Sequence, residues 1–328
     1  MLKKFILQIC TFFIIIVLSF GTIQNPYTSN YIENIKRDSI AVSTFKDPLF
    51  IELEQYAEKH NKAPINAVVD KVWKAIPGLN GLEVDIEASY EKMRKDGNFS
   101  ESKLVYKQVQ PEIKLSDLPP VPIYRGNPEK QMVTLLVNVA WGNEYLPSML
   151  KIMQAHNVKS TFFLDGSWTK KNPTLAKMIT DEGHEIGNHA YSHPDMKKLS
   201  NGRISDEINK TNEVIKATLD VTPKWFAPPS GSFRQDVVDI AKKMDMFTIL
   251  WTVDTVDWRN PEPSAMVTRV LQKVEPGAMI LMHPTASSTG GLEQLITGLK
   301  AKGYQISTVT NLLSEERTGV PSETLESY

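Results

Sequence analysis

From residue 132 onward, short apolar segments alternate with amphipathic helical patterns, and this alternation limits the possible fold more than any other feature. It is typical of a parallel sheet, because a helix must carry the chain back before the next parallel strand can begin. The strand segments are apolar throughout, as in strands covered on both faces. We predict strands at residues 133–137, 160–164, 184–187, 225–227, 247–253, 278–282 and 305–309, and helices at 146–155, 173–181, 204–219, 235–244, 264–274 and 292–302.

So many repeats favour closure of the sheet, and we predict an α/β fold, a distorted barrel of seven or eight strand–helix units. Functional residues of such barrels gather at the carboxyl ends of the strands. Polar and aromatic residues stand at these ends in the sequence, namely Asn138, His189, His193, Pro229, Ser230, Asp254, Asp257, Trp258 and His283.

The chain before the barrel has a different character. Residues 48–110 mix apolar and charged residues at helical spacing, which predicts a small accessory α/β or helical domain. Residues 111–130 contain five prolines and predict an extended linker, because proline disfavours helix. The barrel domain then covers residues 131–315, and residues 316–328 form a solvated tail.

The N-terminus predicts export. Lys3 and Lys4 precede an almost uninterrupted apolar run over residues 5–20, the arrangement of a signal sequence or membrane anchor over residues 1–22. The sequence leaves cleavage open, because the run is nearly long enough to span a membrane. Residues 23–47 then form a tether. We expect the protein at the extracellular face of the membrane or in the cell wall.

Composition removes two other classes of function. The 328 residues carry a formal net charge of −1, whereas a general nucleic-acid binder needs a concentrated basic face. The single cysteine, Cys10, lies inside the apolar N-terminal run, so the exported part has no thiol for a disulfide or a cysteine–zinc site.

Residues 183–194 read Gly-His-Glu-Ile-Gly-Asn-His-Ala-Tyr-Ser-His-Pro and contain the most specific pattern of the chain. His189 and His193 lie four residues apart directly after a predicted strand, a spacing that lets both imidazoles face one point. Two interpretations of this pair remain open, a metal site and a pair of hydrogen-bonded loop histidines. The chain has six histidines in all, and His283 stands at the end of another strand.

Together these motifs resemble the polysaccharide deacetylase family, also called the NodB-homology or carbohydrate esterase family 4 proteins, over residues 132–313. Trp141-Gly142 at the end of the first motif is similar to the sporulation-type deacetylases of Gram-positive spore formers. The resemblance implies hydrolysis of the N-acetyl groups of chitin-like or peptidoglycan sugars. It also implies a divalent metal, often zinc, held by one aspartate and two histidines, which activates water.

The resemblance assigns roles to individual positions. His189 and His193 correspond to the metal ligands, and His283 to the general acid, tuned by Asp257. The other matched positions form the substrate and oxyanion site, with Ser230 offering its backbone N–H beside Pro229, and with Trp258 as a wall of the sugar groove.

Two departures concern the catalytic base. The family has two adjacent aspartates in the first motif, whereas this chain has Asn138 at the base position and no carboxylate after it. The arginine that pairs with the base is replaced by Ala227. Loss of both together is what electrostatics favours, because an arginine buried beside a neutral amide would be an unpaired charge. Asp195 is a further candidate for the missing metal ligand.

Two functions are therefore compatible with the sequence. The first is a metal-dependent deacetylase of a cell-envelope glycan with a weakened base. The second is a non-catalytic relative that binds cell-wall polysaccharide or a partner at the same site.

Overall fold

The structure is a computed structural model that describes residues 12, 31 and 47–318. The chain forms two compact units. Within the described residues, one unit comprises residues 47–61 and 83–107, and the other comprises 62–82 and 108–318. The predicted signal or anchor, almost all of the predicted tether, and most of the predicted tail lie outside the described residues.

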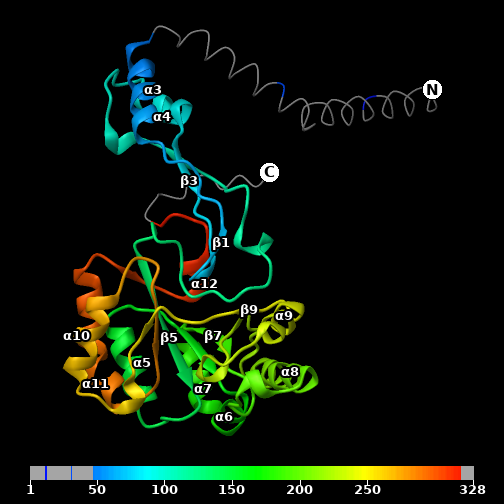
Figure 1. Ribbon diagram of the computed structural model, residues 1–328. Helices are drawn as coiled ribbons and strands as arrows, with labels where there is room; N and C mark the ends of the chain where they lie inside the picture. The colour runs from blue at the N-terminus through cyan, green and yellow to red at the C-terminus, as the bar shows by residue number, and fades with distance from the viewer. Residues whose placement is uncertain (1–11, 13–30, 32–46, 319–328) are drawn as a thin grey trace, which may run out of the picture. The chain divides into compact units, whose positions relative to one another are not determined.

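The larger unit is built on a curled parallel sheet, as Figure 1 shows. Along the sheet the strands follow the order β10-β11-β5-β6-β7-β8-β9, and β12 pairs with the start of β5. The central strand β5 is buried at every residue. The strands are β5 (Met132–Val139), β6 (Thr161–Leu164), β7 (Glu185–Asn188), β8 (Trp225–Phe226), β9 (Phe247–Thr248), β10 (Val253–Asp254), β11 (Met279–Met282) and β12 (Gln305–Ile306).

One stretch of chain joins the two ends of this sheet. The sequence predicts a single strand over residues 247–253, but the structure divides it into β9, paired with β8, and β10, paired with β11. Between them, Leu250 N donates to Ile123 O (2.8 Å) and Thr252 N donates to Met279 O (3.0 Å). The stretch therefore changes neighbours as it crosses the gap, and the predicted distorted barrel is confirmed.

The helices cover the outside of the sheet. Alternation along β5 explains this, because successive side chains of a strand point to opposite faces. Val133, Leu135 and Val137 enter the helix-facing core. Met132 and Leu136 enter the interior core. The helices are α5 (Leu146–Ala155), α6 (Gly166–Lys171), α7 (Pro173–Asp181), α8 (Asn201–Leu219), α9 (Gln235–Lys243), α10 (Pro263–Lys273), α11 (Ala286–Ala301) and α12 (Val309–Leu313). Of these, α6 and α12 are not predicted from the sequence.

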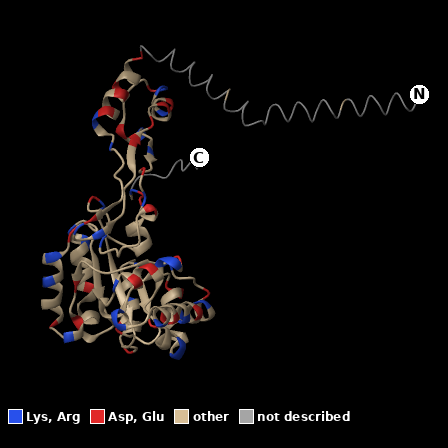
Figure 2. Ribbon diagram, turned by 45° about the vertical axis from the view of Figure 1, so that its right-hand side comes forward, with Lys and Arg blue, Asp and Glu red and all other residues tan. Residues whose placement is uncertain are grey.

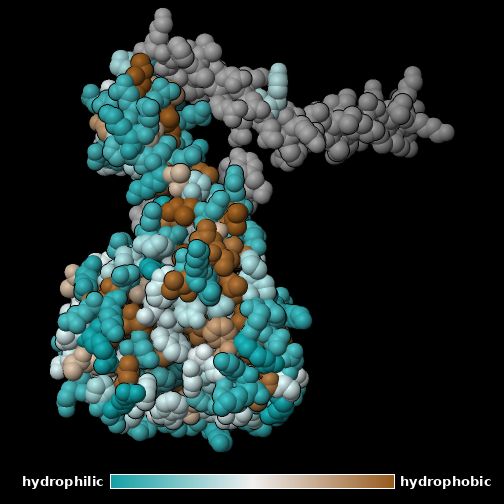
Figure 3. Space-filling model, viewed as in Figure 1, coloured by the Kyte–Doolittle hydropathy of each residue, from teal (hydrophilic) through white to brown (hydrophobic). Residues whose placement is uncertain are grey.

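Residues 62–82 differ from the predicted domain division. The antiparallel hairpin of β1 (Val68–Asp70) and β2 (Lys74–Ile76) belongs to the barrel unit, because Ala75 is buried in the interior core with Ile123. The proline-rich segment is likewise part of this unit rather than a free linker. Figure 3 shows apolar surface over the hairpin, where Val68, Val69 and Val72 are exposed.

The smaller unit packs two helices, α3 (Pro48–His60) and α4 (Ile86–Met93), around a core of Leu49, Leu53 and Met93. Asp47 caps α3 and Asp85 caps α4, each by accepting a backbone N–H. Short strands β3 (Gly81–Val84) and β4 (Tyr106–Val109) pair with each other. In the part of the chain that the structure describes, no helix combines the length and the apolar character needed to cross a membrane.

Candidate active site

The predicted site residues follow the carboxyl ends of neighbouring strands. Asn138 lies one residue before the end of β5, which pairs with β11 on one side and with β6 on the other. His189 follows β7 directly, and His283 follows β11 directly. These strands run parallel in one sheet, so their carboxyl ends lie at one edge and bring Asn138, His189 and His283 to the same end of the barrel. We call this end the mouth of the barrel.

His189 is held as a neutral imidazole with one free nitrogen. Its side chain is buried, and its Nδ1–H donates to Ala227 O at 2.7 Å, since a carbonyl oxygen can only accept. Burial, with a smaller contribution from His193, lowers the pKa of His189 to about 3. At neutral pH its Nε2 therefore carries a lone pair that is not used by the Ala227 contact.

A buried network holds the loop that carries His193. Glu207 of α8 accepts hydrogen bonds from Tyr191 N (2.9 Å), Ser192 N (2.8 Å) and Ser192 Oγ (2.9 Å). His193 itself has a φ of 53°, a left-handed conformation that costs energy for a residue with a Cβ. The contacts of Glu207 thus hold His193 beside His189, with 5.2 Å between the centroids of the two imidazole rings.

Asp165 is a site residue that was not predicted from the sequence. It follows β6, is 2 % exposed, and caps α6 by accepting from Trp168 N at 2.8 Å. Burial raises the pKa of Asp165. Burial lowers the pKa of His193, and the negative charge of Asp165 partly offsets this shift. Its position directly after a predicted strand was the feature of the sequence that could have identified it as a site residue.

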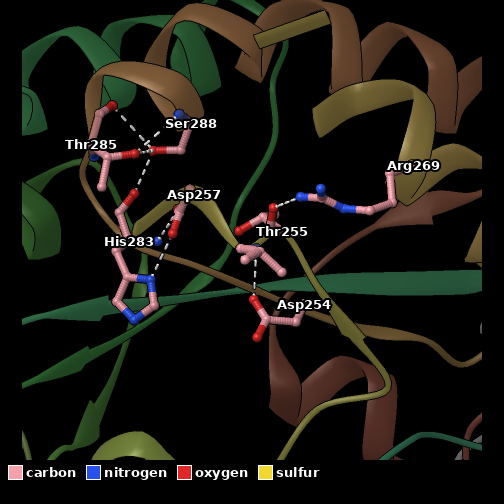
Figure 4. A network of polar contacts seen from close by, with 8 residues as sticks. Asp254, Thr255, Asp257, Arg269, His283, Thr285 and Ser288 are labelled. Carbon is pink, nitrogen blue, oxygen red and sulfur yellow. Dashed lines mark hydrogen bonds and ion pairs between the residues drawn. The ribbon is translucent and has the colours of Figure 1, made fainter. Parts of the chain in front are cut away.

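His283 and Asp257 form the most ordered pair of the mouth. Asp257 is fully buried and accepts from His283 Nδ1 at 2.8 Å and from His283 N at 2.6 Å. Figure 4 shows this pair, with Ser288 donating to the carbonyl of His283 and bonding to Thr285. The contact with Asp257 orients the ring and leaves Nε2 as the atom available to a ligand.

Trp141 covers the face of His283. The two rings stack with 5.3 Å between centroids and 12° between planes, and Trp141 also meets His193 edge-on at 5.9 Å. The following residue, Gly142, has a φ of 81° and approaches Pro284 so closely that a Cβ would collide with its carbonyl oxygen. The glycine therefore permits the contact between the β5 and β11 loops that places the indole at the mouth.

The other predicted residues have separate surroundings. Trp258 is 54 % exposed, and the guanidinium of Arg259 lies over its ring. Ser230 is exposed with a φ of 54°, beside the buried Pro229. Asp254, whose role the sequence leaves open, accepts from Val256 N at 2.7 Å and so caps the following turn.

Asp195 is engaged elsewhere. Its carboxylate accepts from Ser232 Oγ and forms an ion pair with Lys198 at 2.9 Å. These two partners lower the pKa of Asp195, as expected for a solvated charged carboxylate. Within the described part of the chain, the structure does not bring it together with His189 and His193 as a group of three.

The residues of the mouth do not complete a dication centre. Asn138 is 4 % exposed and its Oδ1 is buried without a hydrogen-bond partner, at the position where the resemblance expects the base. Among the residues that the structure describes, no three His, Cys, Asp or Glu side chains could hold a metal ion. Two neutral imidazoles remain, and catalytic zinc takes three protein ligands.

Comparison with known proteins decides the family. The polysaccharide deacetylase family model matches residues 125–249. A peptidoglycan-N-acetylglucosamine deacetylase of Bacillus cereus is 34 % identical over 201 residues, which cover 59 % of this chain and 73 % of the relative. The chain belongs to carbohydrate esterase family 4. Within this family it is 55 % identical to YlxY, an uncharacterised Bacillus subtilis protein, over 97 % of this chain and 99 % of that protein.

A solved structure with the same fold is described as a pseudoenzyme of this family. It is a Bacillus anthracis protein with 52 % identity and a TM-score of 0.78. The match covers 83 % of this chain and 97 % of that chain. A mutant of that protein, matched at 51 % identity with a TM-score of 0.77 over 82 % of this chain and 99 % of that chain, is described as having restored enzymatic activity. The family and a degenerate deacetylase site, both predicted from the sequence, are confirmed.

Proposed function

We propose that this protein is a non-catalytic member of the deacetylase family. It binds N-acetylated cell-wall glycan, with peptidoglycan as the ligand class, at the mouth of the barrel. The observation that carries this proposal is Asn138, an amide whose buried Oδ1 has no partner, at the position where the family places its base. An amide cannot accept a proton at neutral pH. Loss of general-base assistance costs about 10²–10⁴-fold in rate.

The surroundings of Asn138 support loss of catalysis rather than replacement of the base. Asp165 is buried, but its carboxylate is already used by Trp168 N and by Ser167 Oγ at 2.8 Å each. Asp195 is held by Ser232 and Lys198. Both bonds of Asp165 are accepted by Oδ1. Neither carboxylate lies on β5, where the family places its base.

The features that would bind a sugar are retained. Trp141 and Trp258 are 44 % and 54 % exposed, and they are the two largest exposed aromatic surfaces in the described barrel unit. Exposed aromatic rings with a polar edge are suited to the apolar faces and hydroxyls of sugars. The peptidoglycan deacetylases of Bacillus cereus and Bacillus subtilis among the relatives support N-acetylated wall glycan as the ligand class.

Zinc is the metal that the remaining imidazoles would favour, and we expect weak binding because no carboxylate joins them.

We also propose that the protein is exported and held at the extracellular face of the membrane by its N-terminal segment. The apolar run over residues 5–20 after Lys3 and Lys4 supports this. Acidic and basic residues are both scattered over the barrel helices in Figure 2, which does not favour a strongly charged polymer as ligand.

Binding can be tested by titrating the full chain with N-acetylglucosamine oligomers in a calorimeter. We expect Trp258→Ala to weaken binding at least tenfold through loss of ring contact. The control Val72→Ala changes an exposed apolar residue of the hairpin and should leave the affinity unchanged. Equal affinity of wild type, Trp258→Ala and Trp141→Ala would overturn the proposed binding site.

A further inference from the structure

A second pocket lies at the opposite end of the barrel strands. Its walls are Trp73 of the β1–β2 hairpin, Arg125, Thr252, Lys273, Glu275 and Ala278, which all belong to the barrel unit. Thr252 and Ala278 precede β10 and β11, so the pocket opens at the amino ends of these strands. Its cavity volume is about 120 Å³, which is room for a small carboxylate-bearing group.

Arg125 is the unusual residue of this pocket. The side chain is only 10 % exposed, yet its Nε has no hydrogen-bond partner. One nitrogen, Nη2, donates to Pro276 O at 2.7 Å, and the guanidinium lies over the ring of Trp73 at 5.6 Å. A guanidinium has five N–H donors, and the carbonyl of Pro276 takes only one of them, so an acceptor in the pocket can bind the outer donors of Arg125.

The acid nearest to Arg125, Glu275, does not accept a hydrogen bond from it. Glu275 Oε2 lies 3.7 Å from Nη1, beyond hydrogen-bond distance, and its side chain is 72 % exposed. Because Glu275 is largely exposed, solvent screens its attraction to Arg125, and a ligand in the pocket can compete with it. Lys273, at the end of α10, adds a second positive charge to the wall. The pocket thus has two cations against one weakly held anion.

We propose that this pocket binds the carboxylate of a small organic acid between Arg125 and Lys273, beside the ring of Trp73. Arginine pairs with carboxylates in a planar, two-point geometry, and such charge-assisted bonds are stronger than neutral ones. The carboxylate can belong to a free acid or to an acidic sugar of a wall glycan. The site is distinct from the mouth, so it does not depend on the proposed function.

Three probes distinguish these sources. N-acetylmuramic acid and N-acetylglucosamine differ by one lactyl group that carries the carboxylate, and lactate supplies that group alone. The full chain is labelled with 5-fluorotryptophan, and the resonance of Trp73 is assigned through its absence in Trp73→Phe. Fluorine NMR then follows that resonance during each titration. We expect N-acetylmuramic acid to shift it with saturation and N-acetylglucosamine to leave it unchanged. Saturation by lactate as well assigns the site to free acids, and its absence assigns it to the acidic sugar.

Two variants test the residues. Arg125→Lys keeps the charge but removes the planar fork, and we expect at least tenfold weaker binding. Lys273→Gln should weaken binding about threefold, as an exposed charge does, whereas the control Lys243→Gln at the end of α9 should not. Lys273 is exposed, so its variant should fold even if Arg125→Lys does not. The proposal is overturned if no carboxylate shifts the Trp73 resonance, if the neutral sugar shifts it equally, or if Lys273→Gln and Lys243→Gln behave alike.

Discussion

At the scale of single residues, most polar side chains of the mouth are oriented by a hydrogen bond, whereas the Oδ1 of Asn138 has no partner. His189, His283 and Asp257 each have a short hydrogen bond that fixes their orientation. Asn138 lies among them with its Oδ1 buried and unpartnered. Buried polar atoms without partners are rare in folded proteins and occur at sites shaped by function. Under the proposed function, Asn138 occupies the base position of a deacetylase site that has lost its base but keeps its histidines.

Glu207 holds the loop that carries His193, and its replacement by glutamine should loosen this loop. Three donors of the loop and the guanidinium of Arg203 converge on its carboxylate, whereas a glutamine amide presents an N–H to at least one of them. We expect Glu207→Gln to lower the free energy of unfolding by about 1.5–3 kcal/mol in urea titrations. Glu213→Gln, on the exposed face of the same helix, should stay within about 0.5 kcal/mol of wild type. Equal losses in the two variants would contradict the role of Glu207.

His184 should make stability depend on pH. Burial lowers its pKa from 6.5 to about 4, so between these values the unfolded chain binds a proton that the folded chain does not. The contribution is fully present above pH 6.5 and is lost as the pH falls through this window. Near pH 5 we expect a loss of about 2 kcal/mol from this residue.

The variant His184→Asn isolates this effect, because asparagine retains an acceptor for Ser160 N, which donates to His184 Nδ1 at 3.1 Å. The difference in unfolding free energy between about pH 7.5 and about pH 5 should be smaller in the variant by about that amount. The same pH dependence in both proteins would show that His184 does not titrate as described.

Local motifs made part of the mouth predictable. His189, His193 and His283 each follow a strand pattern, and parallel strands bring such positions to one edge. Glu207 and Asp165 were missed for a different reason. Glu207 acts through contacts with a loop earlier in the chain, and no local pattern distinguishes it from a surface glutamate. Asp165 follows a strand but acts through the charge that it presents to His193, which its place in the sequence does not reveal. The roles of the matched residues came from the family resemblance rather than from spacing.

At the scale of elements, the contact between the β5 and β11 loops places Trp141 over His283. Gly142 and Gly303 provide a matched pair that measures this contact. Both have φ near 80° (81° and 82°), but a Cβ at Gly142 meets Pro284 whereas a Cβ at Gly303 meets nothing within 4 Å. Replacement by alanine strains the backbone by about 1–2 kcal/mol at either position.

Gly142→Ala should therefore be the more destabilising variant. The clash with Pro284 adds about 1–3 kcal/mol, as for other overpacked sites. Thermal and urea unfolding of the two variants give the difference directly. If Gly303→Ala is as destabilising as Gly142→Ala, the close approach of the two loops is wrong.

The elements themselves were largely predictable from alternation, with instructive exceptions. The predicted strand over residues 247–253 is divided because its two halves pair with opposite ends of the sheet. Hydrophobicity alone cannot show such a change of partner. Likewise, the predicted last strand ends early, and α12 begins at Val309, the final residue assigned to that strand, with Val309 and Leu312 buried in the interior core.

At the scale of the whole molecule, the barrel unit includes residues that the sequence assigns to an accessory domain and to a linker. Composition marks these segments as turn-rich, but burial of Ala75 and Ile123 in the interior core ties them to the barrel. The hairpin also supplies Trp73 to the second pocket. Residues that the sequence assigns to an accessory domain therefore line the pocket for which we propose a carboxylate ligand.

The central claim is that this fold keeps a deacetylase mouth without its catalysis. Acetate release from N-acetylglucosamine oligomers, with and without added zinc or cobalt, tests it most directly. We expect the wild type to match His189→Ala at the background rate, and Asn138→Asp combined with Ala227→Arg to rise above it, since the pair restores the base and its partner. Acetate release by the wild type that His189→Ala abolishes would contradict the account.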